Sequence, residues 1–174
     1  RDLVRSRGLG DVYKRQRQYQ LSDDESWSLH VARLMIGGKI QNYRNILRRY
    51  IRDYGENENI NRAVQVLEHA KREALATQDK TTLIGYEGMA SNAYFEVLPV
   101  LILNQKADFP FHGRNRRPPK DAVNAMLSFA YTLIANDTSA ALETVGLDPY
   151  VGFLHTLRPG RTSLALDMME ELRA

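Results

Sequence analysis

The chain has 174 residues and no cysteine, so it is long enough for one domain with a sizeable core but cannot use zinc–thiolate sites, disulfides or a cysteine nucleophile. Its formal net charge is +3, from 24 Lys and Arg against 21 Asp and Glu. No apolar run approaches the ~18 residues of a membrane-spanning helix, and no secretory signal pattern is present. We therefore expect a cytoplasmic protein.

The positive charge comes from the first 16 residues, RDLVRSRGLGDVYKRQ. Residues 11–16, DVYKRQ, match the translation of a sequencing-adaptor end, and we expect residues 1–16 to be a disordered read-through artefact. They hold five basic residues and two acids, so 24 − 5 and 21 − 2 leave 19 of each sign in the remainder. A polyanionic partner would then have to be bound by local basic patches.

A long amphipathic helix is predicted next. Ser22 and Glu25 form a capping-box pattern, and apolar residues then recur at helical spacing as far as Tyr54. Gly37-Gly38 should weaken or bend this helix. Four arginines between residues 44 and 52 would usually form a solvated face, and a stripe that contacts phosphates is the alternative.

Two further helices are predicted over about residues 60–76 and from about 81 toward 103. Pro99 should kink or split the second, because proline lacks the N–H donor and clashes with the preceding turn. Glu87 shares the apolar stripe of this helix. A carboxylate there is costly unless it is paired, for example with an arginine, or bound to a metal.

Residues 104–120 form a loop-like segment whose end is rich in basic residues and proline, and it could contact a phosphate backbone or be a solvated loop. Helices are predicted over residues 121–135 and 138–145, and the second should end at Gly146. No segment shows strand alternation. We therefore predict an all-α fold, a helical bundle of irregular connectivity.

The last stretch places His155 in a loop before a short helix that Thr162 or Ser163 could cap. Asp167, Glu170 and Glu171 fall on one face of that helix. Such a face is most often solvated. An imidazole together with carboxylates could also bind manganese or magnesium, which polarise phosphoryl oxygens.

Three separated blocks carry a more specific signal: RNRRPPKDAVNAMLSFAYTL (114–133), GLDPYVGFLH (146–155) and GRTSLALDMMEELR (160–173). With Tyr86-Glu87-Gly88 they resemble the CRISPR-associated adaptation integrase family, Cas-one, over essentially residues 17–174. The resemblance implies the helical catalytic domain of a metal-dependent DNA endonuclease and integrase of CRISPR antiviral defence. Such enzymes insert short DNA fragments into a repeat array by transesterification.

The resemblance also implies site residues and partners. The implied catalytic residues, which are also the implied ligands of Mn²⁺ or Mg²⁺, are Glu87, His155 and Glu170, with Asp167 as a further candidate acid and Glu171 as a surface residue. The implied DNA contacts are Arg114, Arg116, Arg117, Lys120 and Arg173. The full-length family implies double-stranded DNA, a second copy of the chain and a small CRISPR-associated subunit as partners, and no membrane.

Family members begin with a β-rich domain and continue past the last helix. We therefore expect residues 17–174 to be a C-terminally truncated catalytic domain, with uncovered apolar helix faces, doubtful dimerisation, and poor solubility or weak activity in isolation. One alternative is a non-catalytic helical module that binds nucleic acid, with its basic segments on one surface and its acids dispersed. Another is a scaffold domain whose acids pair with arginines. Convergence of Glu87, His155 and Glu170 would distinguish the enzyme from both.

Overall fold

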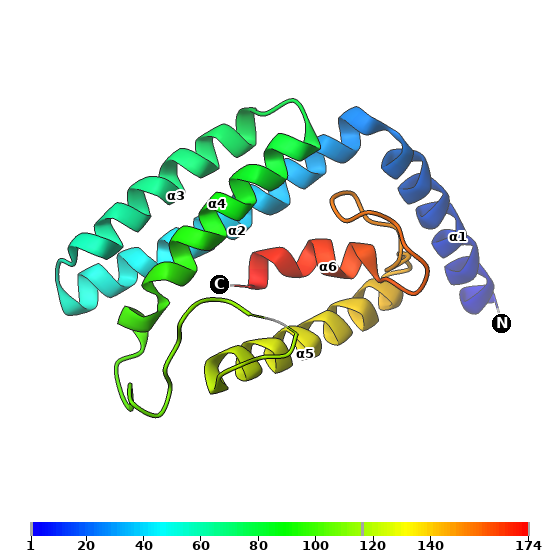
Figure 1. Ribbon diagram of the computed structural model, residues 1–174. Helices are drawn as coiled ribbons and strands as arrows, with labels where there is room; N and C mark the ends of the chain where they lie inside the picture. Colours follow the sequence, from blue (N-terminus) through cyan, green and yellow to red (C-terminus); the bar gives the residue numbers. More distant parts are fainter. Residues whose placement is uncertain (1, 116, 174) are drawn as a thin grey trace.

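The computed structural model describes residues 2–115 and 117–173. Every regular element in these ranges is a helix, as Figure 1 shows, so the predicted all-α fold class is confirmed for the described residues. The elements are α1 (Asp2–Asp23), α2 (Glu25–Tyr54), α3 (Glu58–Ala76), α4 (Lys80–Leu101), α5 (Ala122–Thr144), α6 (Ser163–Met169) and a short 3₁₀ helix, η1 (Glu170–Leu172).

Helix α1 contains most of the segment that the sequence predicted to be disordered, and that prediction is wrong because the chain is helical from Asp2 onward. The buried amide of Gln18 holds the turn after α5: it donates to the carbonyls of Asp148 and Val151, at 2.8 and 2.7 Å, and accepts from the Asp148 N–H at 2.9 Å. The Tyr19 hydroxyl donates to the Asp148 carboxylate at 2.6 Å. The origin of residues 1–16 as a read-through product stays a prediction.

Helix α2 begins after Asp24, whose carboxylate accepts from the Trp27 N–H at 3.0 Å. The predicted cap, Ser22, lies inside α1 instead. The helix runs without a break through Gly37 and Gly38, where the sequence predicted a weakened or bent point. A Cβ at Gly37 would lie 2.9 Å from the Leu75 side chain of α3, and one at Gly38 would lie 2.9 Å from the Glu171 carboxylate. The two glycines therefore allow close approach of neighbouring elements.

Helix α3 runs antiparallel to both α2 and α4, and the three helices enclose the main core (Figure 1). The rings of Tyr43 on α2 and Tyr94 on α4 stack at its centre, with centroids 4.1 Å apart and planes 8° from parallel. Helix α4 continues past Pro99 to Leu101, so the proline does not split it. The other large, fully buried apolar side chains of this core are Ile36, Ile40, Leu47, Ile60, Leu67 and Leu83.

A smaller core joins α6 to α2 and α5 through Met35, Leu142, Leu164 and Ala165. Helix α5 is a single helix through Asn136 and Asp137, which a helix tolerates at a small cost in propensity, so the prediction of two helices over 121–135 and 138–145 is wrong. It ends at Gly146 as predicted. That glycine has φ +84°, and the N–H groups of residues 146 and 147 donate to the carbonyls of residues 143 and 142.

Helix α5 presents an apolar face to solvent. Met126, Phe129 and Leu133 are 52%, 67% and 48% exposed and share one side of the helix. The expectation of uncovered apolar helix faces is therefore confirmed on α5, whereas poor solubility stays a prediction. No helix in the described ranges is both long and apolar enough to cross a bilayer.

Candidate functional site

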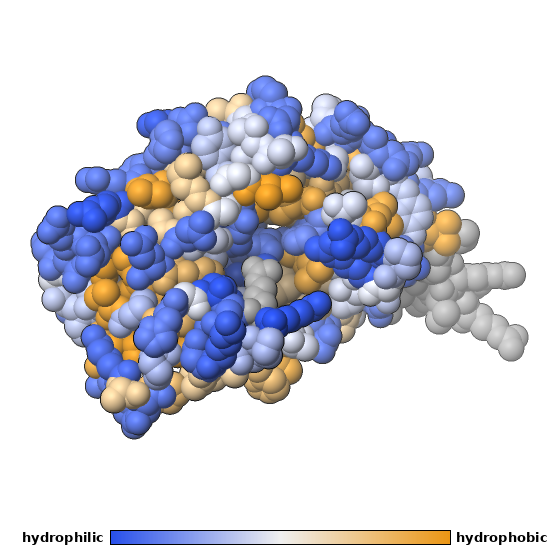
Figure 2. Space-filling view, viewed as in Figure 1, coloured by the Kyte–Doolittle hydropathy of each residue, from blue (hydrophilic) through white to orange (hydrophobic). Residues whose placement is uncertain are grey.

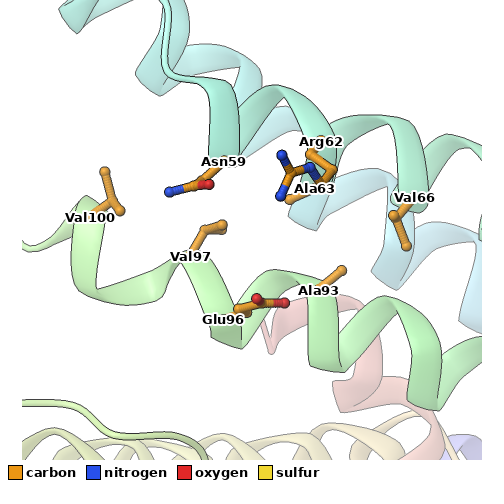
Figure 3. A pocket seen from close by; sticks show the side chains of 8 residues that line it. All are labelled: Asn59, Arg62, Ala63, Val66, Ala93, Glu96, Val97 and Val100. Atoms are coloured by element: carbon orange, nitrogen blue, oxygen red, sulfur yellow. The ribbon is translucent and has the colours of Figure 1, made fainter.

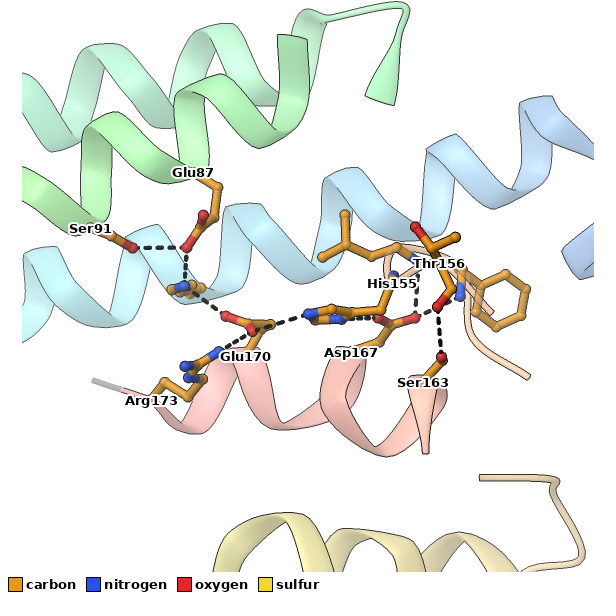
Figure 4. Close-up of polar contacts among 11 residues, drawn as sticks. Glu87, Ser91, His155, Thr156, Ser163, Asp167, Glu170 and Arg173 are labelled. Atoms are coloured by element: carbon orange, nitrogen blue, oxygen red, sulfur yellow. Dashed lines mark hydrogen bonds and ion pairs between the residues drawn. The ribbon is translucent and has the colours of Figure 1, made fainter. Parts of the chain in front are cut away.

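Glu87, His155 and Glu170 come from three separated segments and line one cavity of about 220 Å³. Glu87 lies on α4, His155 in the loop between α5 and α6, and Glu170 at the start of η1. Figure 4 shows their side chains pointing toward a common region between the helices. The face drawn in Figure 2 is hollowed near its centre, and hydrophilic side chains border the hollow.

Lys39 on α2 joins two of these residues. Its side chain is 3% exposed, and its ammonium donates to Oε1 of Glu87 and, at 2.6 Å, to Oε2 of Glu170. The Ser91 hydroxyl, one turn along α4, donates to the same Glu87 oxygen at 2.8 Å. Glu87 is therefore paired with a lysine, where the sequence suggested an arginine or a metal.

The Glu170 carboxylate is almost wholly buried and lies between two basic side chains. Lys39 contacts its Oε2, while Arg173 donates to its Oε1. Burial raises the pKa of Glu170. The charges of Lys39 and Arg173 lower it by a larger amount, so the pKa of Glu170 lies below its ordinary value. Glu170 is thus held ionised, and its Oε1 lies 3.9 Å from Nε2 of His155.

Asp167 positions His155 from the side away from the cavity. The carboxylate is fully buried, and its Oδ2 accepts from the N–H groups of Phe153 and Leu154 at 2.6 and 2.9 Å. Its Oδ1 accepts from the His155 N–H at 2.9 Å and lies 2.6 Å from the ring Nδ1. An ionised carboxylate can only accept, so Nδ1 of His155 donates to Asp167, and Nε2 is the ring nitrogen that faces Glu170.

Gly152 lets the histidine loop pack onto α6. A Cβ at this position would lie 2.5 Å from Oδ2 of Asp167 and 2.8 Å from the carbonyl carbon of Ser163. The start of α6 bears no side-chain cap from Thr162. The Ser163 hydroxyl, the other predicted cap, instead donates to the Thr156 carbonyl at 3.3 Å. The loop is therefore held by backbone and buried-carboxylate contacts that local sequence pattern did not reveal.

A wider groove of about 710 Å³ adjoins the cavity, and both are lined by His155, Arg161 and Arg173. Three of the five predicted DNA contacts, Arg114, Arg117 and Arg173, line it. Lys120 is exposed but does not line the groove, and Arg116 lies outside the described residues. Two further arginines, Arg158 and Arg161, line the groove and were not predicted as site residues from the sequence.

Two arginines of this groove, Arg114 and Arg173, contact side chains of α5. Buried Asn124 accepts from Arg114 at 2.7 Å and from the Asn115 N–H at 3.0 Å, while its own amide donates to the Gly113 carbonyl and to Asp121. The guanidinium groups of Arg114 and Arg173 lie 5.5 and 4.7 Å from the centroid of the Tyr131 ring. The groove therefore presents positioned positive charge next to the acidic cavity.

Other charged side chains lie apart from this region. On α2, partly buried Arg44 pairs with Glu68, while exposed Arg49 and Arg52 pair with Asp53, which favours the interpretation of a solvated face for the last two. Glu171 is exposed, as predicted. Figure 3 shows a separate cavity of about 210 Å³ between α3 and α4, which none of the predicted site residues line. The module with dispersed acids is therefore disfavoured.

Two carboxylates and an imidazole facing one cavity suit a hard divalent cation in their donor chemistry. In their present positions, however, no three His, Asp or Glu side chains in the described part of the chain are placed to hold a metal ion. The Lys39 ammonium lies between Glu87 and Glu170 instead. The assignment of these three residues as metal ligands therefore stays a prediction.

The profile of one protein family, described as CRISPR associated protein Cas1, matches residues 2–174. The chain is 44% identical over 162 residues to the CRISPR-associated endonuclease Cas1 of Leptospira interrogans serovar Lai, an alignment that covers 91% of this chain and 64% of that protein. Against several other curated relatives the chain spans 49% of their length.

Two solved structures have the same arrangement of helices. A chain of a partial Cas6-RT-Cas1--Cas2 complex superposes with a TM-score of 0.78 at 28% identity, covering 90% of this chain and 45% of that one. A casposase bound to its integration product superposes with a TM-score of 0.75 at 25% identity, covering 94% and 47%.

Proposed function

The chain belongs to the Cas1 family, and from that premise we propose that it is the helical catalytic part of a DNA endonuclease and integrase of CRISPR spacer acquisition. The observation that carries the proposal is the convergence of Glu87, His155 and Glu170 on one cavity beside an arginine-lined groove. A reaction centre requires such a convergence of residues, here from α4, a loop and η1. A scaffold domain does not require it.

In this proposal Glu87, His155 and Glu170 hold a manganese or magnesium ion. When bound, such an ion polarises a phosphoryl oxygen and stabilises the attacking or leaving oxygen. Asp167 accepts from Nδ1 of His155, which leaves Nε2 as the ring nitrogen directed at the cavity. Arg173 remains at the wall that the cavity shares with the groove, where it can contact a phosphate of the substrate.

The proposed substrate is double-stranded DNA. Positioned arginines beside an acidic centre suit a phosphodiester, because they contact the backbone and keep the acids at the scissile bond. In strand transfer a DNA 3′-hydroxyl oxygen forms a new bond to phosphorus, the existing P–O bond breaks, and the hydroxyl proton ends on the leaving oxygen or in solvent. In hydrolysis, water takes the place of the hydroxyl. The likeness to a casposase bound to an integration product supports the strand-transfer chemistry.

We further propose that the longer protein works with a second copy of itself and with a Cas2-type subunit. The support is that one of the superposed structures is a Cas6-RT-Cas1--Cas2 complex.

The test uses the full-length parent protein, a short DNA duplex and a repeat-bearing plasmid, with Mn²⁺ present. Strand transfer is compared between the wild type and the variants Glu87→Ala, His155→Ala and Glu170→Ala, and DNA binding is measured in parallel. Glu96→Ala is the matched control, because Glu96 lies on the same helix but lines the separate cavity of Figure 3. We expect the three site variants to lose strand transfer while binding DNA. Full activity in Glu87→Ala would overturn the proposal.

A further inference from the structure

Lys39 is the feature of the site that the proposed chemistry leaves unexplained. It is a buried lysine whose ammonium contacts carboxylates from two elements that are far apart in the chain. Arg173, one of the two arginines that line the cavity, contacts Glu170. Lys39 is thus the basic side chain that links Glu87 to Glu170.

The ammonium supplies what two neighbouring carboxylates need. Like charges brought together away from water repel strongly, and a positive charge between them offsets that repulsion. A divalent cation would meet the same requirement through the same oxygens. At the position of the ammonium a divalent cation would use the same oxygens, Glu87 Oε1 and Glu170 Oε2, so the two positive charges cannot occupy that position together.

We propose that Lys39 is an internal counter-ion of the site, which holds Glu87 and Glu170 together and has to leave their shared position before a divalent cation binds. This inference rests on the proposed cation site. The Tyr43 ring, whose centroid lies 5.7 Å from the Lys39 nitrogen, and the adjoining cavity are both within reach of the displaced ammonium. Cation binding would then include the cost of breaking two buried ion pairs.

Two measurable consequences follow for the 174-residue chain. Without an added cation, Lys39→Met should unfold at a temperature several degrees lower, since it leaves two carboxylates close together without the positive charge that lies between them. The same variant should bind Mn²⁺ roughly tenfold more tightly or better, because the competing charge is gone. A lysine with a merely structural role would lower stability without raising affinity for the cation.

The experiment measures Mn²⁺ binding by calorimetry and melting temperature with and without Mn²⁺. Lys71→Met is the control, because it removes the same charge from a lysine that donates to the side-chain oxygen of Gln41 and forms no ion pair within the described residues. If Lys39→Met is too unstable to purify, Lys39→Gln removes the charge while keeping an amide that can donate to the carboxylates. We expect both Lys39 variants to bind Mn²⁺ more tightly than the wild type and Lys71→Met.

Glu87→Gln distinguishes failure of the proposed cation site from failure of the counter-ion proposal. If Mn²⁺ binding to the wild type does not weaken in Glu87→Gln, the cation site of the proposed function is wrong. If it does weaken but both Lys39 variants bind Mn²⁺ no more tightly than the wild type, the counter-ion proposal is overturned and the cation site stands.

Discussion

The Asp167 carboxylate holds His155 at two points, its backbone N–H at 2.9 Å and its ring Nδ1 at 2.6 Å. The other oxygen of the same carboxylate holds the two preceding N–H groups of the loop. One buried side chain therefore fixes both the path of the loop and the direction of the imidazole.

Asp167→Asn tests whether the carboxylate, and not just a buried polar side chain of the same size, fixes the loop and the imidazole of His155. The asparagine amide has only one oxygen that can accept. In either orientation its NH₂ group would therefore face N–H groups that a carboxylate oxygen of Asp167 now accepts from. We expect strand transfer by the full-length protein to fall roughly 10–100-fold. We expect the free energy of unfolding of this chain to fall by about 1–3 kcal/mol, measured by urea titration. Asp137→Asn, on the exposed side of α5, should change neither. Wild-type values in Asp167→Asn would mean that other contacts hold the histidine.

Gly152→Ala should damage the same loop by steric conflict. The added methyl group would lie 2.5 Å from the Asp167 carboxylate and 2.8 Å from backbone, and backbone cannot move aside cheaply. We expect a loss of about 1–3 kcal/mol in the free energy of unfolding, the usual cost of overpacking. Gly85→Ala is the contrast: it meets open space on α4 and should stabilise the chain by about 0.5–1 kcal/mol. Equal effects of the two substitutions would contradict the packing described here.

Arg161→Ala should weaken DNA binding by the groove. The side chain lines both the groove and the acidic cavity, so it is placed to contact phosphates near the reacting bond. We expect weaker binding at every DNA sequence, with a salt dependence of log K that is shallower by about one. Fluorescence anisotropy at several salt concentrations measures both quantities. Arg62→Ala removes the same charge beside the separate cavity and should leave the salt dependence unchanged.

Asp121→Asn tests the N-terminus of α5 through pH. The Asn124 N–H lowers the pKa of Asp121, and side-chain amides of Asn124 and Asn115 lower it further, against a smaller opposing effect of burial. A lowered folded-state pKa gives stability that is present above the unfolded pKa and lost as pH falls through the folded value. The melting temperature of Asp121→Asn should therefore lie below that of the wild type at pH 7, and the difference should shrink as the pH falls toward ~3. A difference that is constant with pH would contradict this role for the ionised carboxylate.

The helices of the main core were predictable because each has a continuous apolar stripe. The predicted and observed bounds of α3 differ only at its start, where Asn57 caps the helix. Prediction failed where a local signal conflicted with packing. Gly37 and Gly38 indicated a weak point in α2, but the structure uses them for close approach to Leu75 and Glu171, which lie far along the chain.

The candidate site was predictable only through family resemblance. Spacing alone could not select Glu170 from its acidic neighbours, since burial and the Lys39 contact distinguish it and neither is visible in a local pattern. Lys39 itself was missed, although one signal was present. It lies among Met35, Ile36 and Tyr43 on a helix face that otherwise enters the core, and a lysine there requires an anionic partner.

The ion pair between Lys39 and Glu170 joins residues that are 131 positions apart, whereas α2, α3 and α4 follow one another along the chain. Closing the longer loop costs more conformational entropy, so the three-helix unit can form before α6 and η1 dock against it. The reaction centre would then be assembled in the final step of folding. Amide hydrogen exchange should accordingly show η1 opening at lower free energy than α2, and each such opening would dismantle the site while the main core stays intact.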